Sequence, residues 1–222
     1  MTKKQDAWSV VLLFDPLAIP LTRKMVSWGA TPTPITLASL ALGILAAIVG
    51  ATARGPVMGG LTALGYYCSF LLDCIDGKVA RLRQMTSRRG ALLDLMGDAW
   101  KTLAFSIALI TRAWSLSFSW FVITLWTVLG LYTIKIVADL RGQALERKAE
   151  PILQPVRPRW LPARFVNGPS SIDVEVLMYG VWLPGIVGGI NLRAALAAAA
   201  AIVTTRVLRE MYGTVVLATR GN

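Results

Sequence analysis

Four carboxylates lie close together in a largely apolar sequence, within residues 73–98. The stretch has the pattern Asp-x2-Asp-Gly-x2-Ala-Arg-x8-Gly-x3-Asp-x3-Asp. Unpaired acids beside hydrocarbon are costly, so we expect these carboxylates to bind divalent cations. Hard oxygen ligands suit Mg²⁺ or Mn²⁺, and such ions often bind together with substrate phosphates. Two ions sharing the four carboxylates could clamp a diphosphate.

The spacing predicts that the acids lie on two facing helix surfaces. Asp73, Gly77 and Ala80 share one face of the first helix, with Asp76 beside Asp73. On the next helix, residues four apart share a face, namely Gly90, Asp94 and Asp98. The short turn between the helices predicts that they are antiparallel neighbours, so that two carboxylates converge from each side. The small residues leave a groove in which the flat base of a nucleotide, or a backbone, could approach closely. Arg81 could hold phosphate oxygens.

A structural alternative is a set of ion pairs within the stretch. Asp73 and Asp76 could pair with Lys78 or Arg81, and Asp98 with Lys101. A single Asp–Arg pair would favour that interpretation. Four acids at this spacing, with small residues on the same faces, favour a metal site.

The elements that hold the stretch are predicted to be membrane helices. Hydrophobic residues make up 55% of the chain, charged residues 16%, and mean hydropathy is +0.58, which is typical of an integral membrane protein. Apolar runs approach the roughly 20 residues that span a bilayer. We predict an all-α integral membrane protein with six transmembrane helices, at 35–53, 57–72, 91–111, 114–134, 170–190 and from 192 into the tail. Residues 1–34 form an N-terminal segment with an amphipathic interfacial helix at 16–28, and residues 35–222 form the membrane domain.

Charge predicts the orientation and limits the chemistry. The net charge is +11, and the basic residues gather at the N-terminus and in two of the predicted connections. This asymmetry places both termini and the acidic stretch at the cytoplasmic face of the cell membrane. Apolar runs leave little soluble surface for nucleic acid, so we expect anionic lipid and phosphate-bearing substrates as partners. The chain has no histidine, so catalysis must use carboxylates, lysine or arginine.

The full pattern resembles the signature of the CDP-alcohol phosphotransferase (CDP-alcohol phosphatidyltransferase) family at every defined position. The resemblance implies transfer of a substituted phosphate from a CDP-alcohol to an acceptor hydroxyl, with release of CMP, by an enzyme that is usually a homodimer. It implies that Asp73, Asp76 and Asp94 bind the metals, and that Asp98 contributes to the second ion and acts as general base. The implied nucleotide site consists of Gly77, Ala80, Arg81, Gly90 and Thr36. A Thr-Pro-Asn-x-x-Thr segment often precedes the first span in the family, and Thr33 replaces the Asn here.

The acceptor site is predicted from the charged residues of the later helices, which are Lys135, Asp139, Arg141, Asp173 and Arg206. Bacterial phosphatidylinositol-phosphate synthases are similar in size and also have a lysine near the end of the fourth span. Their Glu-Arg-Pro-Glu-Arg segment is replaced here by residues 168–175, which include Asp173 and Glu175. This difference argues against an inositol-phosphate acceptor and suits a neutral or cationic one.

Three other functions remain open on the sequence alone. The donor, expected to be CDP-diacylglycerol, could be a soluble CDP-alcohol used with a lipid or other hydroxyl acceptor. An intramembrane prenyltransferase also binds Mg²⁺-diphosphate through paired aspartates, but it has more spans and lacks the Gly-x2-Ala-Arg pattern. A small transporter would carry acids through the depth of the membrane instead of a cluster near one face.

Overall fold

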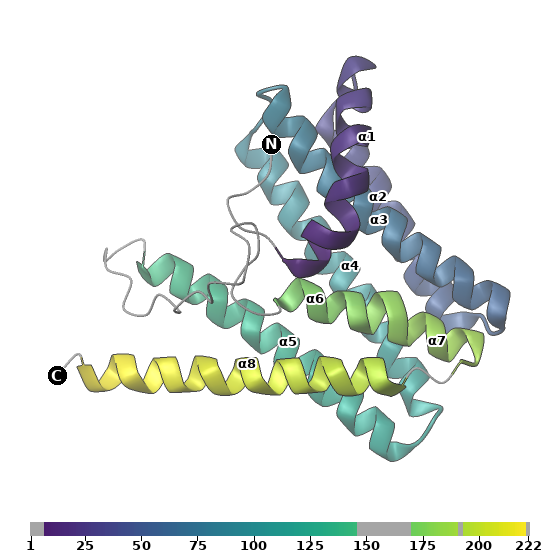
Figure 1. The fold of residues 1–222 in the computed structure, drawn as a ribbon, viewed down its shortest axis with the longest axis vertical. Helices are drawn as coiled ribbons and strands as arrows, with labels where there is room; N and C mark the ends of the chain where they lie inside the picture. Colours follow the sequence, from purple (N-terminus) through teal and green to yellow (C-terminus); the bar gives the residue numbers. More distant parts are fainter. Residues whose placement is uncertain (1–6, 146–169, 191–192, 221–222) are drawn as a thin grey trace.

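The chain is described from a computed structural model, which covers residues 7–145, 170–190 and 193–220. For residues 137–145 and 210–220 it describes the helix without the side chains. Every element in this part of the chain is a helix (Figure 1), which confirms the predicted all-α class. In order they are η1 (Val10–Phe14), α1 (Asp15–Ser27), α2 (Pro32–Thr52), α3 (Pro56–Leu82), α4 (Arg88–Trp114), α5 (Phe118–Leu145), α6 (Ser171–Glu175), η2 (Val176–Trp182), α7 (Leu183–Gly188) and α8 (Arg193–Arg220).

Proline and glycine determine where the first helices begin. α2 begins at Pro32, α3 begins at Pro56, and α1 has Pro16 in its first turn. Proline suits these positions because the first turn leaves backbone N–H groups unused. Gly29 and Gly55 have φ values of 79° and 110° and precede α2 and α3, a backbone conformation that residues with a side chain adopt only with strain. The helix starts therefore depend on residue types that can be read directly in the sequence.

Four helical segments of the described chain are long and apolar enough to cross a membrane. They are Pro32–Thr52, Pro56–Leu82, Phe118–Ile136 and Ser171–Gly188. Two further helices, α4 and α8, have 27 and 28 residues and occupy the places of the other predicted spans. At 1.5 Å per residue both exceed the roughly 30 Å of the hydrocarbon core. α4 also carries Asp94, Asp98 and Lys101, which lower its hydropathy. The six-span arrangement stays a prediction.

Part of the core lies where α3, α4 and the segment from α6 to α7 meet, and it continues to α2, α5 and α8. The rings of Tyr66, Phe105 and Tyr179 form a cluster, with centroids 5.2 Å apart for Tyr66–Phe105 and 5.5 Å for Phe105–Tyr179. The Ser106 hydroxyl lies 2.7 Å from the Tyr179 hydroxyl, so this buried phenol is hydrogen-bonded. α3 also approaches α7 closely at Gly59, where a Cβ atom would lie 2.7 Å from the Pro184 carbonyl oxygen. Such small residues allow membrane helices to pack backbone against backbone.

The N-terminal helix packs along α3 (Figure 1). Its buried face is formed by Asp15, Ala18 and Thr22. Two leucines of the predicted amphipathic helix point away from the protein, with 58% of Leu17 and 40% of Leu21 exposed. An apolar face turned away from the bundle supports an interfacial position, which stays a prediction.

Candidate active site

Helices α3 and α4 bring three carboxylates together. Asp73 and Asp76 lie on α3 and Asp94 on α4, and one oxygen of each lies within 4.8 Å of the other two. Asp76 is buried, and its Oδ2 atom has no hydrogen-bond partner among the described residues. A buried carboxylate oxygen without a donor is unfavourable, so a cation fits this position. Three hard oxygen ligands suit Mg²⁺ or Mn²⁺.

A third helix, α2, packs against both acid-bearing helices. Within the described residues, the backbones of α3 and α4 scarcely approach each other, whereas α2 packs closely against both. The two helices thus meet through side chains, as in the Tyr66–Phe105 ring contact and the pairing of Lys101 with Asp73, and not through close backbone packing. Their carboxylates do converge. Two reciprocal hydrogen bonds fix α2 against α3: the Ser39 hydroxyl donates to the Ser69 carbonyl at 2.9 Å, and the Ser69 hydroxyl to the Ser39 carbonyl at 2.8 Å. Small residues at this contact allow α2 to support both helices.

Asp98 lies beside this group and is paired with a lysine. The Lys101 ammonium group forms ion pairs with Asp73 and with Asp98, the latter at 3.0 Å. Asp98 is the more exposed of the two acids, with 51% of its side chain accessible against 19% for Asp73. An exposed carboxylate at the edge of the group can be reached by an incoming hydroxyl. The ion pair of Asp98 with Lys101 confirms one of the pairings that the sequence left open.

The residues expected to bind the nucleotide surround the same acids. Gly77 lies one position after Asp76, and a Cβ atom there would lie 3.5 Å from the Arg81 guanidinium, which therefore extends over Gly77. Arg81 is exposed and Ala80 is half-buried. The Thr36 hydroxyl lies beside the Asp76 carboxylate and also donates to the Pro32 carbonyl at 3.2 Å. The structure does not test nucleotide binding by these four residues, so that role stays a prediction.

Gly90 belongs to the cap that starts α4. Its N–H donates to the Ser87 hydroxyl at 3.0 Å, and a Cβ atom on Gly90 would lie 3.1 Å from that oxygen. Ser87 is thus an N-cap that satisfies a backbone donor at the helix start. The glycine is exposed one turn before Asp94, so it leaves the approach to the acids open.

A buried ion pair fixes α1 to α3, the helix that carries Asp73 and Asp76. Lys78 Nζ lies 3.0 Å from Asp15 Oδ1, and both side chains are almost fully buried, at 7% and 5% exposed. Lys78 also donates to the Cys74 carbonyl at 3.2 Å. It therefore does not pair with Asp73 or Asp76, as one alternative from the sequence would have it. Arg83 donates to the carbonyls of residues 29 and 30, which holds the turn between α1 and α2 against the end of α3.

The predicted acceptor residues do not form one group in the structure. Lys135 of α5 forms an ion pair with Glu175 of α6 and donates to the Thr102 hydroxyl at 3.4 Å. Asp173 accepts hydrogen bonds from the Ser170 N–H at 2.6 Å and the Ser170 hydroxyl at 2.9 Å, as part of a capping box, and from the Ser9 N–H at 2.6 Å.

The remaining acceptor candidates lie further along their helices. Arg206 is half-buried on α8. The side chains of Asp139 and Arg141 lie outside the described residues. The acceptor roles of all these residues, and of Lys135 and Asp173, stay predictions.

The sequence analysis named Lys135 and Glu175 as separate acceptor candidates and did not predict that they pair. It paired Lys101 with Asp98 and did not predict the pairing with Asp73. Glu175 is buried, and its carboxylate lies within electrostatic range of Asp98 and Lys101. The sequence did indicate that Lys135 and Glu175 have partners, because a charged residue inside an apolar span requires one. The sequence could not identify that partner, since it lies on a helix far away in the chain.

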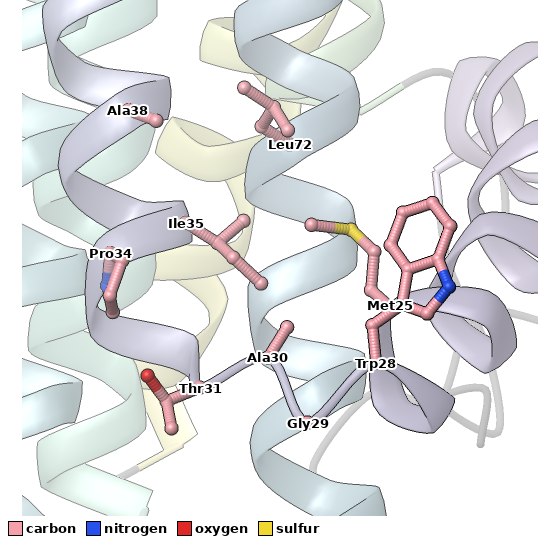
Figure 2. A pocket seen from close by; sticks show the side chains of 9 residues that line it. All are labelled: Met25, Trp28, Gly29, Ala30, Thr31, Pro34, Ile35, Ala38 and Leu72. Atoms are coloured by element: carbon pink, nitrogen blue, oxygen red, sulfur yellow. The ribbon is translucent and has the colours of Figure 1, made fainter.

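An open hollow between the first three long helices is lined mainly by apolar side chains. It has a volume of about 450 Å³ and lies between α1, α2 and α3 (Figure 2). Its walls are Met25, Trp28, Gly29, Ala30, Thr31, Pro34, Ile35, Ala38 and Leu72. Leu72, one of these walls, lies one position before Asp73 on α3, and the acids of the site are not among the residues that line the hollow.

Comparison with known proteins agrees with the geometry. No curated protein sequence matches the chain. The family model for CDP-alcohol phosphatidyltransferase matches residues 29–160, which is more than half of the 222 residues and includes all four acids of the site. The chain therefore belongs to the CDP-alcohol phosphatidyltransferase family.

Proposed function

We propose that this protein transfers a substituted phosphate group from CDP-diacylglycerol to the hydroxyl of a small polar alcohol, with release of CMP, in phospholipid biosynthesis. Family membership establishes the coarser reaction, from a CDP-alcohol to an acceptor. The observation that carries the proposal is the group formed by Asp73, Asp76 and Asp94, with the buried and unpartnered oxygen of Asp76. That arrangement fits a cation, and a cation there can bind a diphosphate.

The chemistry needs a metal pair and a base. Two Mg²⁺ or Mn²⁺ ions, when bound, would neutralise the diphosphate and favour departure of CMP. Asp73, Asp76 and Asp94 would hold them, with Asp98 contributing to the second. Asp98 accepts the proton of the acceptor hydroxyl while the hydroxyl oxygen forms a bond to the phosphorus that carries the alcohol, and the bond from that phosphorus to CMP breaks. A carboxylate base contributes roughly 10²–10⁴-fold to such a rate.

The apolar hollow supports a lipid-linked donor. Its volume of about 450 Å³ compares with roughly 30 Å³ for one water molecule, so it can accommodate a length of acyl chain. One of its walls, Leu72, lies one position before Asp73 on α3, and we assign the acyl chain of the donor to this hollow on that ground. The exposed Trp28 at its edge suits the boundary between membrane and water.

The charges on the acceptor side favour an alcohol without a phosphate. Lys135 forms an ion pair with the buried Glu175, which reduces its attraction for an anion. We therefore propose a neutral or cationic acceptor. The protein would act as a homodimer in the cell membrane, with its site and termini on the cytoplasmic side.

A CMP-release assay tests the proposal. The purified full-length protein is incubated with Mg²⁺ or Mn²⁺, with CDP-diacylglycerol or soluble CDP-alcohols as donors, and with a set of acceptor alcohols. Release of CMP from CDP-diacylglycerol, with the lipid label retained on the product, is expected. Release only from a soluble CDP-alcohol in the presence of a lipid acceptor would reverse the donor assignment. The absence of CMP with every pair would contradict the proposal.

A further inference from the structure

Lys101 is a cation built into the group of acids. Its ammonium group contacts carboxylates on two helices, Asp73 on α3 and Asp98 on α4, and also donates to the Ser39 hydroxyl of α2 at 3.1 Å. Only 12% of the Lys101 side chain is exposed. A buried ammonium with three oxygen neighbours from three helices is held in one place.

The rest of the Lys101 side chain is also fixed. Its Cγ and Cδ atoms lie beside Gly43 of α2, where a Cβ atom would approach each to 3.1 Å. Ser39 is itself fixed, because it is fully buried and its hydroxyl donates to the Ser69 carbonyl. The position of the ammonium group is therefore determined by the packing of α2 and does not depend only on its attraction to the acids.

The geometry separates the four acids into two sets. Asp73, Asp76 and Asp94 form the group with metal-ligand spacing, and Asp98 is not part of it. The Lys101 ammonium contacts both Asp98 and Asp73, the acid nearest to it on α3. A second divalent ion shared by Asp73 and Asp98 would have to take the place that this ammonium group occupies.

The net charge of the group limits how many cations it can bind. With all four carboxylates ionised, the acids and Lys101 leave three negative charges, and one divalent ion reduces them to one. A second divalent ion would then leave a positive charge beside Lys101. The diphosphate of a CDP-alcohol brings two negative charges and removes this cost. Like charges a few ångströms apart in a partly buried site repel strongly.

We propose that Lys101 is a positioning residue that makes metal loading depend on the donor. It holds Asp73 and Asp98 so that the free protein binds one divalent ion, and the second ion binds only together with a diphosphate. Asp98 is thereby kept in its ion pair with Lys101 until the donor is present. This inference rests on the proposed function, since it assumes a diphosphate donor.

Equilibrium binding of Mn²⁺ to the purified full-length protein, measured by the electron paramagnetic resonance of the free ion, tests the proposal. We expect one tightly bound ion per chain without nucleotide and two in the presence of CDP. Lys101→Met removes the charge and keeps the length of the side chain, so it should bind the second ion about tenfold more tightly without CDP. Lys101→Arg keeps the charge and should behave like the original protein.

The Ser39→Ala variant tests the same coupling while Lys101 stays in place. It removes one neighbour of the ammonium group, so the second ion should bind about threefold more tightly without CDP. An Mn²⁺ isotherm without CDP that is unchanged in both Lys101→Met and Ser39→Ala would overturn the proposal. So would two equally tight ions in the original protein without CDP. CMP release by the original protein is measured in parallel, because its absence would contradict the proposed function and not the role of Lys101.

Discussion

At the scale of single residues, each lysine described inside the apolar helices is paired with a carboxylate from another helix. Lys78 pairs with Asp15, Lys101 with Asp73, and Lys135 with Glu175. Such pairs offset the cost of placing charge away from water. Asp76 is the buried aspartate of the motif that these lysines do not contact, and this is the position that a cation fits.

The role of Asp98 as general base predicts a loss of activity that is much larger than any loss of CDP binding. Asp98→Asn keeps the shape of the side chain and removes the ability to accept a proton. CMP release should fall by roughly 10²–10⁴-fold. Binding of CDP, measured by calorimetry in the presence of Mg²⁺, should fall much less than CMP release, because Asp98 contributes only to the second ion. Full CMP release by this variant would remove Asp98 from the role of base.

The group of three acids predicts that Asp76 controls the first metal ion. Asp76→Asn replaces the buried carboxylate by an amide, which is a weaker ligand for a hard cation. The affinity for Mn²⁺ should fall by about tenfold or more, and binding of CDP should weaken with it. The measurement is Mn²⁺ binding, with the thermal midpoint as a check that the variant is folded. An unchanged metal affinity would be incompatible with a metal site at these three acids.

At the scale of elements, α1 is fixed to the helix that carries the motif. The Asp15–Lys78 pair lies inside the contact between α1 and α3, and Lys78 comes directly after Gly77 of the motif. The preceding turn η1 reaches α6, where the Ser9 N–H donates to Asp173. The N-terminal segment thus contacts both the donor side of the site and the start of the later helices.

Breaking this buried pair should destabilise the protein. Lys78→Met leaves Asp15 buried without its partner and should lower the free energy of unfolding by about 3 kcal/mol. Adding Asp15→Leu should restore most of the loss, because a buried apolar pair needs no compensation for desolvation. The thermal midpoint in detergent is the measurement, and Arg23→Gln, at an exposed position of the same helix, is the control. Equal midpoints for Lys78→Met and the original protein would show that the pair contributes nothing.

At the scale of the whole molecule, the site lies in the part of the chain built from α1 to α4. The helices from α5 onward are joined to it mainly through contacts of α3 and α4 with α7, η2 and α5. The close approach at Gly59 is one of these contacts. The motif that binds the donor thus lies within one set of helices, and Lys135 and Glu175 come from the other.

The predicted orientation can be tested on the turns at the two ends of α4. Cys68 and Cys74, the two cysteines of the chain, are first replaced by Ala, and single cysteines are then introduced as Gln84→Cys and Leu116→Cys. If α4 crosses the membrane with the site in the cytoplasm, a membrane-impermeant maleimide should label only the cysteine at 116 in intact cells. Inverted vesicles should give the opposite result. Labelling of both positions from the same side would contradict the six-span arrangement.

The sequence alone predicted the helices and the reacting groups. Helix boundaries could be predicted from prolines, glycines and the lengths of apolar runs, which are local properties. The acids of the motif could be assigned to shared helix faces because the spacing of a helix is fixed. Their type and number indicated a divalent cation before any distance was known, and the family match agrees with that reaction.

Tertiary structure decided which charges meet. The sequence predicted that α3 and α4 are neighbours, and their side chains do meet. It did not predict that α2 packs closely against both, which small and hydroxyl-bearing residues such as Ser39 and Gly43 allow. The pairing of Lys135 with Glu175 joins helices far apart in the chain, and periodicity carries no information about such contacts. The position of Lys101 between Asp73 and Asp98 depends on the packing of three helices at once. The spacing within a helix thus determined which groups are available for chemistry, and the packing between helices determined which of them are neutralised by a partner.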